Sequence, residues 1–341
     1  MLNNVMSIND RLKEIKKEVN FSGVICLKND HDTALESASG YYNRADELTN
    51  NINTRFGIAS GCKLFTSIGI CQLVEKGVIS FDTKLKDCLD IECPNFDEEI
   101  TIHHLLSHTS GIPDYFDEDV MDNFEDLWKE RPMYLLKSLK DFLPMFQNNK
   151  MMFKPGERFY YNNAAFILLG LIIEQQTKVS FTDYIETNIF KRSGMNHSGY
   201  FSMDKLPKNT ALGYIGNEDG SWRTNTYSIP VKGGADGGAY ITAPDMVKFW
   251  EALFNYKLLS KRTADLLLTP HVQQKDNEYY GYGIWITKKD ESIFKYHVMG
   301  YDPGVSFKSS AYPNHGIKLV VISNKGGGPY QITEEVEKSL V

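Results

Sequence analysis

A serine and a lysine stand three residues apart, at positions 60 and 63. On a helix, positions i and i+3 share one face about 5–6 Å apart, so the Lys63 amine can reach the Ser60 hydroxyl. A serine hydroxyl is a weak nucleophile until a neighbouring base takes its proton. A lysine acts as that base only when desolvation lowers its pKa well below about 10.4. The pair therefore indicates a serine nucleophile activated by a lysine.

The residues after Ser60 predict the helix that positions this pair. Apolar side chains recur at helical spacing until Gly77, at Leu64, Phe65, Ile68, Cys71, Leu73 and Val74. A helix is therefore expected over about 61–76, with Ser60 at its N-terminus, where unpaired amides and the macrodipole favour negative charge. Helix capping by the Ser60 side chain is the alternative interpretation of this residue.

A second group of polar residues lies where a turn at 155–163 leads into an apolar helical run at 164–174. Here the chain resembles the serine β-lactamase and penicillin-binding-protein superfamily, especially its class C and D-alanyl-D-alanine carboxypeptidase-like branch. The family's second motif is Tyr-x-Asn, which Tyr161-Asn162-Asn163 matches. Further matches follow in the family's order over most of the chain, at 77–82, 100–113, 233–245 and 280–283.

The resemblance implies a role for each residue of this motif. A phenol beside an ammonium group is expected to have a lowered pKa, so Tyr161 would shuttle a proton between the nucleophile and the leaving group. Asn163 would donate its amide to a substrate carbonyl and hold the lysine. The alternative is that Tyr160 and Tyr161 are ordinary half-buried aromatic residues in a turn.

The family's third motif is altered in this chain. The family places Lys or His, a small residue and Gly on a strand before a Gly-x-Pro-Gly-Phe-like stretch, and the corresponding run here is 295–307. Alignment on Pro303 without a gap puts Val298 at the cationic position, whereas one inserted residue, such as a bulge, puts His297 there. Neighbouring residues of a regular strand face opposite sides, so only one of the two can line the site.

This alteration bears on the substrate. Penicillins and D-alanyl peptides carry a carboxylate that the family usually binds near this strand, so an ester or a neutral amide is an equally open choice. The substrate-binding residues expected from the resemblance are Asn163, His297, Gly300 and Tyr301. The Tyr301 amide is expected to complete an oxyanion hole with the Ser60 amide.

Composition excludes few functions, but it limits the kinds of partner molecule that we expect. The net charge of −7 comes from 37 basic and 44 acidic residues without a basic tract, so we expect no nucleic-acid partner. No stretch approaches the roughly 18–20 apolar residues of a membrane span. Residues 1–17 resemble an amphipathic helix rather than a signal peptide, which predicts a cytoplasmic location unless a leader was removed.

Cysteines and histidines predict neither disulfides nor a metal. The cysteines are odd in number and clustered, which is typical of reduced thiols: Cys26, Cys62, Cys71, Cys88 and Cys93. Cys62 is expected to pack inward from the nucleophile helix. His104 and His108 have the i, i+4 spacing of zinc-binding helices, but no Glu follows His104 and His103 defines no third ligand. We therefore expect no metal and no cofactor.

The predicted elements suggest how these residues come together. Helices are expected at 8–18, 61–76, 244–255 and from 330, and strands at 21–28, 33–40, 281–288, 292–299, 304–312 and 317–323. The family's architecture implies an α/β (α+β) fold of the β-lactamase/transpeptidase-like type, an antiparallel sheet flanked by helices with an inserted helical lobe. One catalytic domain would span 1–341, with a sheet lobe at about 1–60 plus 200–341 and a helical lobe at about 61–200. An aromatic and acidic stretch at 115–128 would suit a lid.

Together these observations predict a serine hydrolase that forms an acyl-enzyme on an ester or amide, with Ser60, Lys63 and Tyr161 as catalytic residues. The substrate would be a small molecule or peptide, whether a β-lactam, a D-amino-acid peptide or a carboxylic ester. A non-catalytic ligand-binding or penicillin-sensing protein that retains the fold is the alternative, and the altered third motif favours it.

Overall fold

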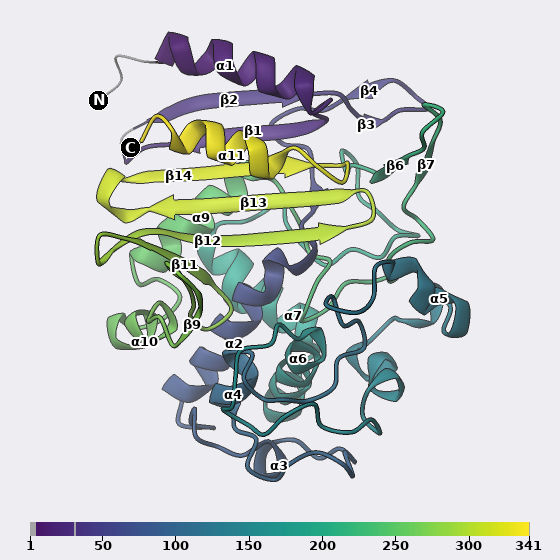
Figure 1. Ribbon diagram of the computed structural model, residues 1–341, viewed down its shortest axis with the longest axis vertical. Coiled ribbons are helices and arrows are strands. Elements are labelled where there is room, and N and C mark those ends of the chain that lie inside the picture. Colours follow the sequence, from purple (N-terminus) through teal and green to yellow (C-terminus); the bar gives the residue numbers. More distant parts are fainter. Residues whose placement is uncertain (1–4, 31, 341) are drawn as a thin grey trace.

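An eight-stranded sheet forms the centre of the molecule (Figure 1). The computed structural model describes residues 5–30 and 32–340. Every neighbouring pair of strands in this sheet is antiparallel, in the order β2-β1-β14-β13-β12-β11-β10-β9. The strands are β1 (Gly23–Lys28), β2 (Thr33–Ser39), β9 (Val272–Lys275), β10 (Glu278–Tyr280), β11 (Trp285–Lys289), β12 (Ser292–Asp302), β13 (Val305–Tyr312) and β14 (Ile317–Ser323). The two ends of the chain thus share one sheet.

Helices cover both faces of this sheet, and those of the central part of the chain form a separate mass beside it (Figure 1). The longer helices are α1 (Val5–Glu18), α2 (Lys63–Glu75), α6 (Asn163–Thr177), α9 (Ala243–Phe254), α10 (Lys261–Leu267) and α11 (Pro329–Glu337). The short ones are α3 (Leu85–Cys88), α4 (Ile102–Leu106), α5 (Leu127–Glu130), α7 (Phe181–Ile185) and α8 (Lys191–Ser193). Three two-stranded ribbons complete the fold: β3 (Tyr41–Asn43) with β4 (Leu48–Thr49), β5 (Phe56–Gly57) with β8 (Tyr240–Ile241), and β6 (Tyr214–Gly216) with β7 (Trp222–Thr224).

The alternation of side chains along the strands separates two hydrophobic cores. On β1, Val24 and Cys26 pack into the large core shared with α2, α6 and α9, whereas Ile25 and Leu27 pack with α1 and α11. We call these the inner and the outer face of the sheet. Every later assignment of a strand residue to the catalytic side follows from this alternation.

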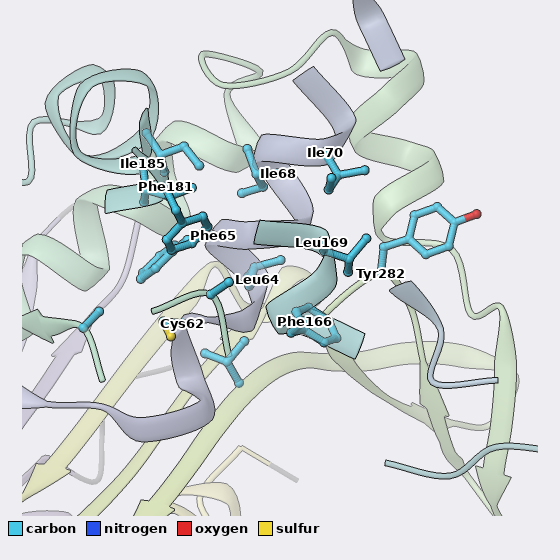
Figure 2. Close-up of a cluster of buried hydrophobic side chains, with 14 of the residues drawn as sticks. Cys62, Leu64, Phe65, Ile68, Ile70, Phe166, Leu169, Phe181, Ile185 and Tyr282 are labelled. Atoms are coloured by element: carbon cyan, nitrogen blue, oxygen red, sulfur yellow. The ribbon is translucent and has the colours of Figure 1, made fainter. Parts of the chain in front are cut away.

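The nucleophile helix α2 is buried almost all round, from Lys63 to Leu73. Figure 2 shows Phe65 of α2 beside Phe181 of α7, and Phe166 of α6, in the same core, lies nearer Leu64. Phe65 also meets the ring of Phe190 edge to face, with ring centres 4.9 Å apart. A helix packed on all sides is held rigidly, which suits a helix that must aim a catalytic lysine.

The fold class predicted from the sequence is confirmed. The predicted helices at 8–18, 61–76 and 244–255 correspond to α1, α2 and α9. Residues 1–4 of the predicted N-terminal amphipathic segment lie outside the described residues. Strands β9 and β10 were not predicted, because Val272–Lys275 is mostly exposed and polar and so lacks the alternation of a half-buried strand.

The cysteines and the apolar helices bear on the expectations about disulfides and membrane spans. All five cysteines are free. Among the described residues, no single helix is long and apolar enough to cross a membrane; one pair, Asn163–Thr177 with Phe181–Ser193, passes by length and composition but bends by 80°.

Candidate active site

Ser60 lies in a tight turn of 3₁₀ helix, Ala59–Cys62, that runs directly into α2. Ala59 has a left-handed φ of 44°, which is strained for a residue other than glycine. Its carbonyl accepts a hydrogen bond of 3.2 Å from the Gly238 amide, and the Ile58 amide donates to the Ala239 carbonyl at 3.0 Å. Pairing between these two segments therefore holds the strained turn that presents Ser60.

Lys63 is 2% exposed, and its ammonium has three neighbours at hydrogen-bond distance. The Nζ atom lies 2.9 Å from Ser60 Oγ, 2.8 Å from Asn163 Oδ1 and 2.8 Å from the Asp236 carbonyl oxygen. The last two oxygens are pure acceptors, so they take two N–H donors and leave the remaining direction of the amine for Ser60. The predicted Ser60–Lys63 contact exists, and the Lys63 amine is one partner of the Ser60 hydroxyl.

Tyr161 stands over the same pair. Its ring centre lies 4.9 Å from Lys63 Nζ. Burial raises the pKa of the phenol well above its ordinary value, as does the negative charge of Glu118, although a hydrogen bond with the Ser60 hydroxyl lowers it. The expectation of a lowered Tyr161 pKa is therefore wrong, because burial and the charge of Glu118 raise the pKa by more than the Ser60 hydrogen bond lowers it. A raised pKa favours the protonated form of the Tyr161 phenol.

Asn163 is held by Asp114, a residue that the sequence did not single out. The Asp114 carboxylate accepts from the backbone amides of Asn163, at 2.7 Å, and Ala164, at 2.9 Å, and from the Asn163 side-chain amide at 3.2 Å. The Phe116 carbonyl lies 3.4 Å from the same side-chain nitrogen. Asn163 therefore holds the lysine as predicted, but both hydrogens of its amide already have acceptors within the protein, so neither is left for the expected donation to a substrate carbonyl.

His108 fixes the turn that carries Tyr161. The backbone amide of Asn162 donates to His108 Nδ1 at 3.1 Å, so the ring proton sits on Nε2, which faces the Tyr280 hydroxyl at 3.1 Å. Burial, followed by the charge of Lys63, lowers the pKa of His108 well below its ordinary value. The rings of His108 and Tyr161 pack with centres 4.5 Å apart. A neutral histidine thus supports the turn that presents Tyr161.

Strand β12 resolves the ambiguity of the third motif. The register with β13 runs without a break from Tyr296 to Asp302, so no inserted residue separates His297 from Gly300. Val298 packs in the core on the inner face, whereas His297 lies on the outer face, 4% exposed and 3.5 Å from Glu278. His297 therefore does not line the site; the predicted contact with substrate fails because strand alternation turns its side chain away.

The end of β12 borders the nucleophile. The last residue of β12 that pairs with β11 at this end is His297, opposite Trp285, so residues 298–302 form a sheet edge. Gly300 lies so close to the nucleophile turn that a Cβ atom there would stand 2.8 Å from the Ser60 amide nitrogen and clash with the Ile58 carbonyl. Only glycine allows this approach. The predicted residues Gly300 and Tyr301 are thus brought to Ser60, with Tyr301 67% exposed.

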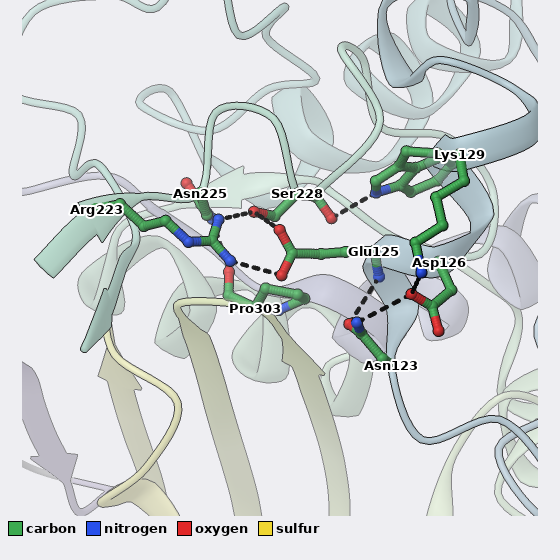
Figure 3. A network of polar contacts seen from close by, with 9 residues as sticks. Asn123, Glu125, Asp126, Lys129, Arg223, Asn225, Ser228 and Pro303 are labelled. Atoms are coloured by element: carbon green, nitrogen blue, oxygen red, sulfur yellow. Dashed lines mark hydrogen bonds and ion pairs between the residues drawn. The ribbon is translucent and has the colours of Figure 1, made fainter. Parts of the chain in front are cut away.

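A cavity of about 1070 Å³ opens in front of Ser60. Its walls include Ser60, Tyr161 and Asn163, the β12 edge, and a segment spanning residues 115–125. That segment is the predicted lid, and Figure 3 shows how it is anchored. Glu125 pairs with Arg223 at 2.6 Å and accepts from the Ser228 hydroxyl at 2.7 Å, while the Trp128 indole donates to the Ser228 carbonyl at 2.8 Å. The segment forms a fixed wall of the cavity.

Two carboxylates give one end of the cavity an acidic character. Asp236 accepts a short hydrogen bond from the Tyr115 hydroxyl, and burial raises its pKa. Burial and the neighbouring charge of Asp236 raise the pKa of Asp302 to about 7. No hydrogen-bond or ion-pair partner of the Asp302 side chain is found among the described residues.

The other histidines of the 103–108 stretch lie away from Ser60. His103 contacts the Tyr282 hydroxyl at 2.8 Å, and His104 accepts from the Thr101 amide at 3.2 Å to cap α4. Within residues 5–30 and 32–340, no group of His, Cys, Asp or Glu side chains is arranged to hold a metal ion. Cys62 points inward, fully buried, and burial raises its pKa to about 12.

Comparison with known proteins agrees with this geometry. A family model described as Beta-lactamase matches residues 8–338. The chain is 28% identical over 326 residues to penicillin-binding protein 4* of Bacillus subtilis (strain 168), which covers 89% of this chain and 68% of that protein. It is 55% identical to a penicillin binding protein from Bacillus halodurans of known crystal structure, with a TM-score of 0.92 over 96% of this chain and 99% of that one.

More distant structures share the fold. A D-amino acid amidase from Ochrobactrum anthropi SV3, solved in complex with D-phenylalanine, superimposes with a TM-score of 0.80 at 23% identity over 98% of both chains. The family model spans nearly the whole chain, and the serine and tyrosine that the sequence singled out line one cavity, with the lysine in contact with both behind them. The protein therefore belongs to the Beta-lactamase family.

Proposed function

We propose the following roles for the residues by which this serine hydrolase forms and clears an acyl-enzyme. Ser60 Oγ attacks the carbonyl carbon of an ester or amide while its proton passes to Lys63, and the carbonyl electron pair moves onto oxygen. The tetrahedral intermediate then collapses, the bond to the leaving group breaks, and Tyr161 protonates that group while Lys63 returns the proton to Tyr161. Water repeats the sequence on the acyl-enzyme and releases the acid.

One observation carries this proposal: the Lys63 amine points at the Ser60 hydroxyl. Two carbonyl oxygens, from Asn163 and Asp236, hold the amine, and its third direction meets the nucleophile at 2.9 Å. A structural lysine would be paired with a carboxylate, whereas this one faces neutral oxygens and a hydroxyl. General-base geometry of this kind typically contributes ~10²–10⁴-fold to a rate.

The backbone supplies the remaining part. The amides of Ser60 and Tyr301 are the donors that we assign to the oxyanion hole, because Gly300 brings the end of β12 against the nucleophile turn. Each such donor is typically worth ~10²–10³ in turnover, since it is already oriented when charge develops on the oxygen. A residue larger than glycine at position 300 would separate the two amides.

The test is the mass of the intact protein after brief exposure to a penicillin and, separately, to an activated short-chain ester. We expect an acyl adduct or ester turnover with the native chain and neither with Ser60→Ala. The matched control is Ser67→Ala, which removes a buried hydroxyl further along α2 that has no hydrogen-bond partner among the described residues. If the native chain forms no adduct and turns over neither compound, the ligand-binding alternative replaces this proposal.

The substrate that we propose is a small molecule or peptide carrying the scissile bond. The most similar solved structure cited above is of a protein named as penicillin binding, which supports including a β-lactam in the test. The cytoplasmic location expected from the sequence stays a prediction.

A further inference from the structure

Two oxygens outside α2 set the direction of the Lys63 amine. Asn163 Oδ1, at the start of α6, and the Asp236 carbonyl oxygen each lie 2.8 Å from Lys63 Nζ. The two acceptors belong to separate parts of the chain, so other contacts in the fold have to fix each of them relative to Ser60. A misplacement of about 1 Å can slow a reaction about 10²-fold, so the groups that fix these oxygens matter for the proposed chemistry.

Asp114 fixes the first acceptor, Asn163. Asp114 Oδ2 accepts from the backbone amide of Asn163 at 2.7 Å and from its side-chain amide at 3.2 Å. Asp114 Oδ1 accepts from the backbone amides of Ala164, at 2.9 Å, and Tyr115, at 2.8 Å. Because the carboxylate only accepts, it binds the nitrogen end of the Asn163 amide and leaves the oxygen end for Lys63.

Tyr115, the next residue in the chain, fixes the second acceptor. Its hydroxyl donates a hydrogen bond to Asp236 Oδ2, and the two side chains are 7% and 6% exposed. The ring of Tyr115 packs against Phe142 with ring centres 5.2 Å apart, so the hydroxyl has little freedom to move. A carboxylate anchored in this way holds the backbone of its own residue, and with it the carbonyl oxygen that meets Lys63.

This anchor is needed because the peptide bond that carries the carbonyl can rotate easily. It joins Asp236 to Gly237, and glycine allows more backbone conformations than other residues. A neighbouring contact fixes where the segment passes, since Thr66 Oγ1 donates to the Ala235 carbonyl at 2.6 Å. That contact does not reach the Asp236 side chain, which Tyr115 binds.

The same bond occupies the Asp236 carboxylate, which would otherwise be free to pair with the lysine. Lys63 Nζ meets the carbonyl oxygen of Asp236, whereas the carboxylate of that residue is bonded to Tyr115. A carboxylate paired directly with the amine would stabilise the ammonium, which cannot take a proton from Ser60. Burial raises the pKa of Asp236, while the charge of Lys63 and the hydrogen bond from Tyr115 lower it and so favour the charged form.

We propose that Asp114 and Tyr115, two consecutive residues, are positioning residues that direct the Lys63 amine at the nucleophile. Each acts through one of the two acceptors. This inference rests on the proposed function, because the direction of the amine matters only if the amine takes the proton of Ser60. Tyr115 also lines the cavity, as does Phe116 after it, so substrate bound there contacts the segment that directs the base.

The first test is steady-state kinetics of the full chain with an activated short-chain ester. Tyr115→Phe keeps the ring and removes only the hydroxyl. We expect kcat to fall about 10- to 100-fold and KM to stay within about twofold, because the amine loses its direction while the cavity keeps its shape. In a Lys63→Met background the same substitution should change the residual rate by less than about twofold, since no amine remains to be directed.

Asp114 and Asp236 supply conservative variants. Asp114→Asn places an amide nitrogen against N–H donors, and we expect kcat to fall about 10- to 100-fold with the same dependence on Lys63. Asp236→Asn keeps an oxygen for the Tyr115 hydroxyl, whereas Asp236→Ala keeps none. We expect the alanine variant to lose at least about fivefold more in kcat than the asparagine variant, and Tyr115→Phe to add little to the loss of the alanine variant.

Tyr312→Phe is the matched control. It also removes a buried tyrosine hydroxyl that donates to a carboxylate, that of Glu337 at 2.6 Å, but on the outer face of the sheet. It should lower the Tm by a similar amount to Tyr115→Phe and leave kcat within about twofold of the native value. Thermal melting of every variant shows which are folded. If Asp114→Asn does not fold, Tyr115→Phe still tests the proposal.

An undiminished kcat in Tyr115→Phe overturns the inference. An equal fold-loss in the native and Lys63→Met backgrounds also overturns it, because the role of Tyr115 would then be independent of the lysine. An equal loss in Tyr312→Phe has the same meaning. Failure of the proposed function gives a different result, namely no adduct and no turnover in the native chain, with Lys63→Met indistinguishable from it.

Discussion

Two buried lysines, Lys63 and Lys308, differ in what the protein provides for them. Lys63 meets three oxygens of the chain within 2.9 Å, whereas Lys308 has a tyrosine ring at 4.4 Å and no acceptor among the described residues. Three oxygens fix the direction of the Lys63 amine, and the only hydroxyl among them is that of Ser60. Lys308 lies on the outer face of the sheet, since its neighbour Phe307 packs on the inner face, and no such set within the described chain fixes its amine. Equal burial therefore does not imply equal roles.

The largest difference between the two lysines should appear with a neutral ester. Lys63→Met removes the proposed base, and we expect kcat/KM to fall about 10³–10⁴-fold for neutral and anionic substrates alike. Lys308→Met should leave the neutral ester unaffected. Steady-state kinetics on both variants checks this, with thermal melts to show that the oxygens of Asn163 and Asp236 tolerate the loss of their donor. Full activity in Lys63→Met would remove Lys63 from the mechanism.

Each lysine also lies over a tyrosine ring, which allows a matched pair of substitutions. Tyr161→Phe keeps the ring near Lys63 but removes the hydroxyl that protonates the leaving group, so we expect a loss of about 10²–10³-fold in kcat. Tyr330→Phe keeps the ring near Lys308, and we expect kcat within about twofold of the native value. Comparable losses in the two variants would contradict the separate roles given to the two rings.

Asp302, at the acidic end of the cavity, should make the thermal stability of the protein depend on pH. The pKa of Asp302 is raised to about 7 in the folded protein, so its contribution to stability is greatest at low pH and is lost as the pH rises towards 7. Asp302→Asn does not titrate. We expect its Tm to exceed that of the native protein by more at pH 8 than at pH 5, by a few degrees. A difference that is the same at both pH values would mean that Asp302 is not the titrating group.

The smallest effect is expected at Cys62, which stands between nucleophile and base in the sequence. Its thiol is fully buried and points towards the Gly234 carbonyl at 3.7 Å, away from Ser60. Cys62→Ala should keep acylation rates within about threefold, and iodoacetamide should label Cys93, which is partly exposed, before Cys62. Acylation lost in this variant but kept in Ser60→Ala would identify Cys62 as the nucleophile.

What the sequence could predict about the site depends on the distance along the chain over which each contact acts. Ser60 and Lys63 are three residues apart, so helical geometry alone brings them together. The third acceptor of Lys63 is the backbone carbonyl of Asp236, 173 residues away, and no pattern of side chains in the sequence predicts this contact. Asp114 was not predicted for a related reason. An acidic residue after a proline is typical of an ordinary turn. Only the folded structure shows that its carboxylate accepts from the first amides of α6.

The third motif shows a different limit. Alternation required that His297 and Val298 face opposite sides, and this could be stated in advance. Which of them faced inward depended on where β12 carries its irregularity. The irregularity lies between Ile293 and Lys295, where the pairing with β11 shifts, and so precedes both residues. The sequence does not distinguish Lys308 from other lysines. Its lack of a hydrogen-bond or ion-pair partner among the described residues is visible only in the packed structure.

The order of strands in the central sheet has a consequence for synthesis of the protein. Strand β1 lies between β2 and β14, with Gly23 opposite Ser323, so one of its two neighbours is made 300 residues after it. At ~5–20 residues per second, that interval lasts about 15–60 s on the ribosome. The segments that carry Ser60, Lys63 and Tyr161 emerge during this time, but β12 lacks its neighbour β13 until residues 305–312 have been made. The nascent chain thus lacks the Tyr301 amide, one of the two proposed oxyanion donors, until β12 (Ser292–Asp302) has been made.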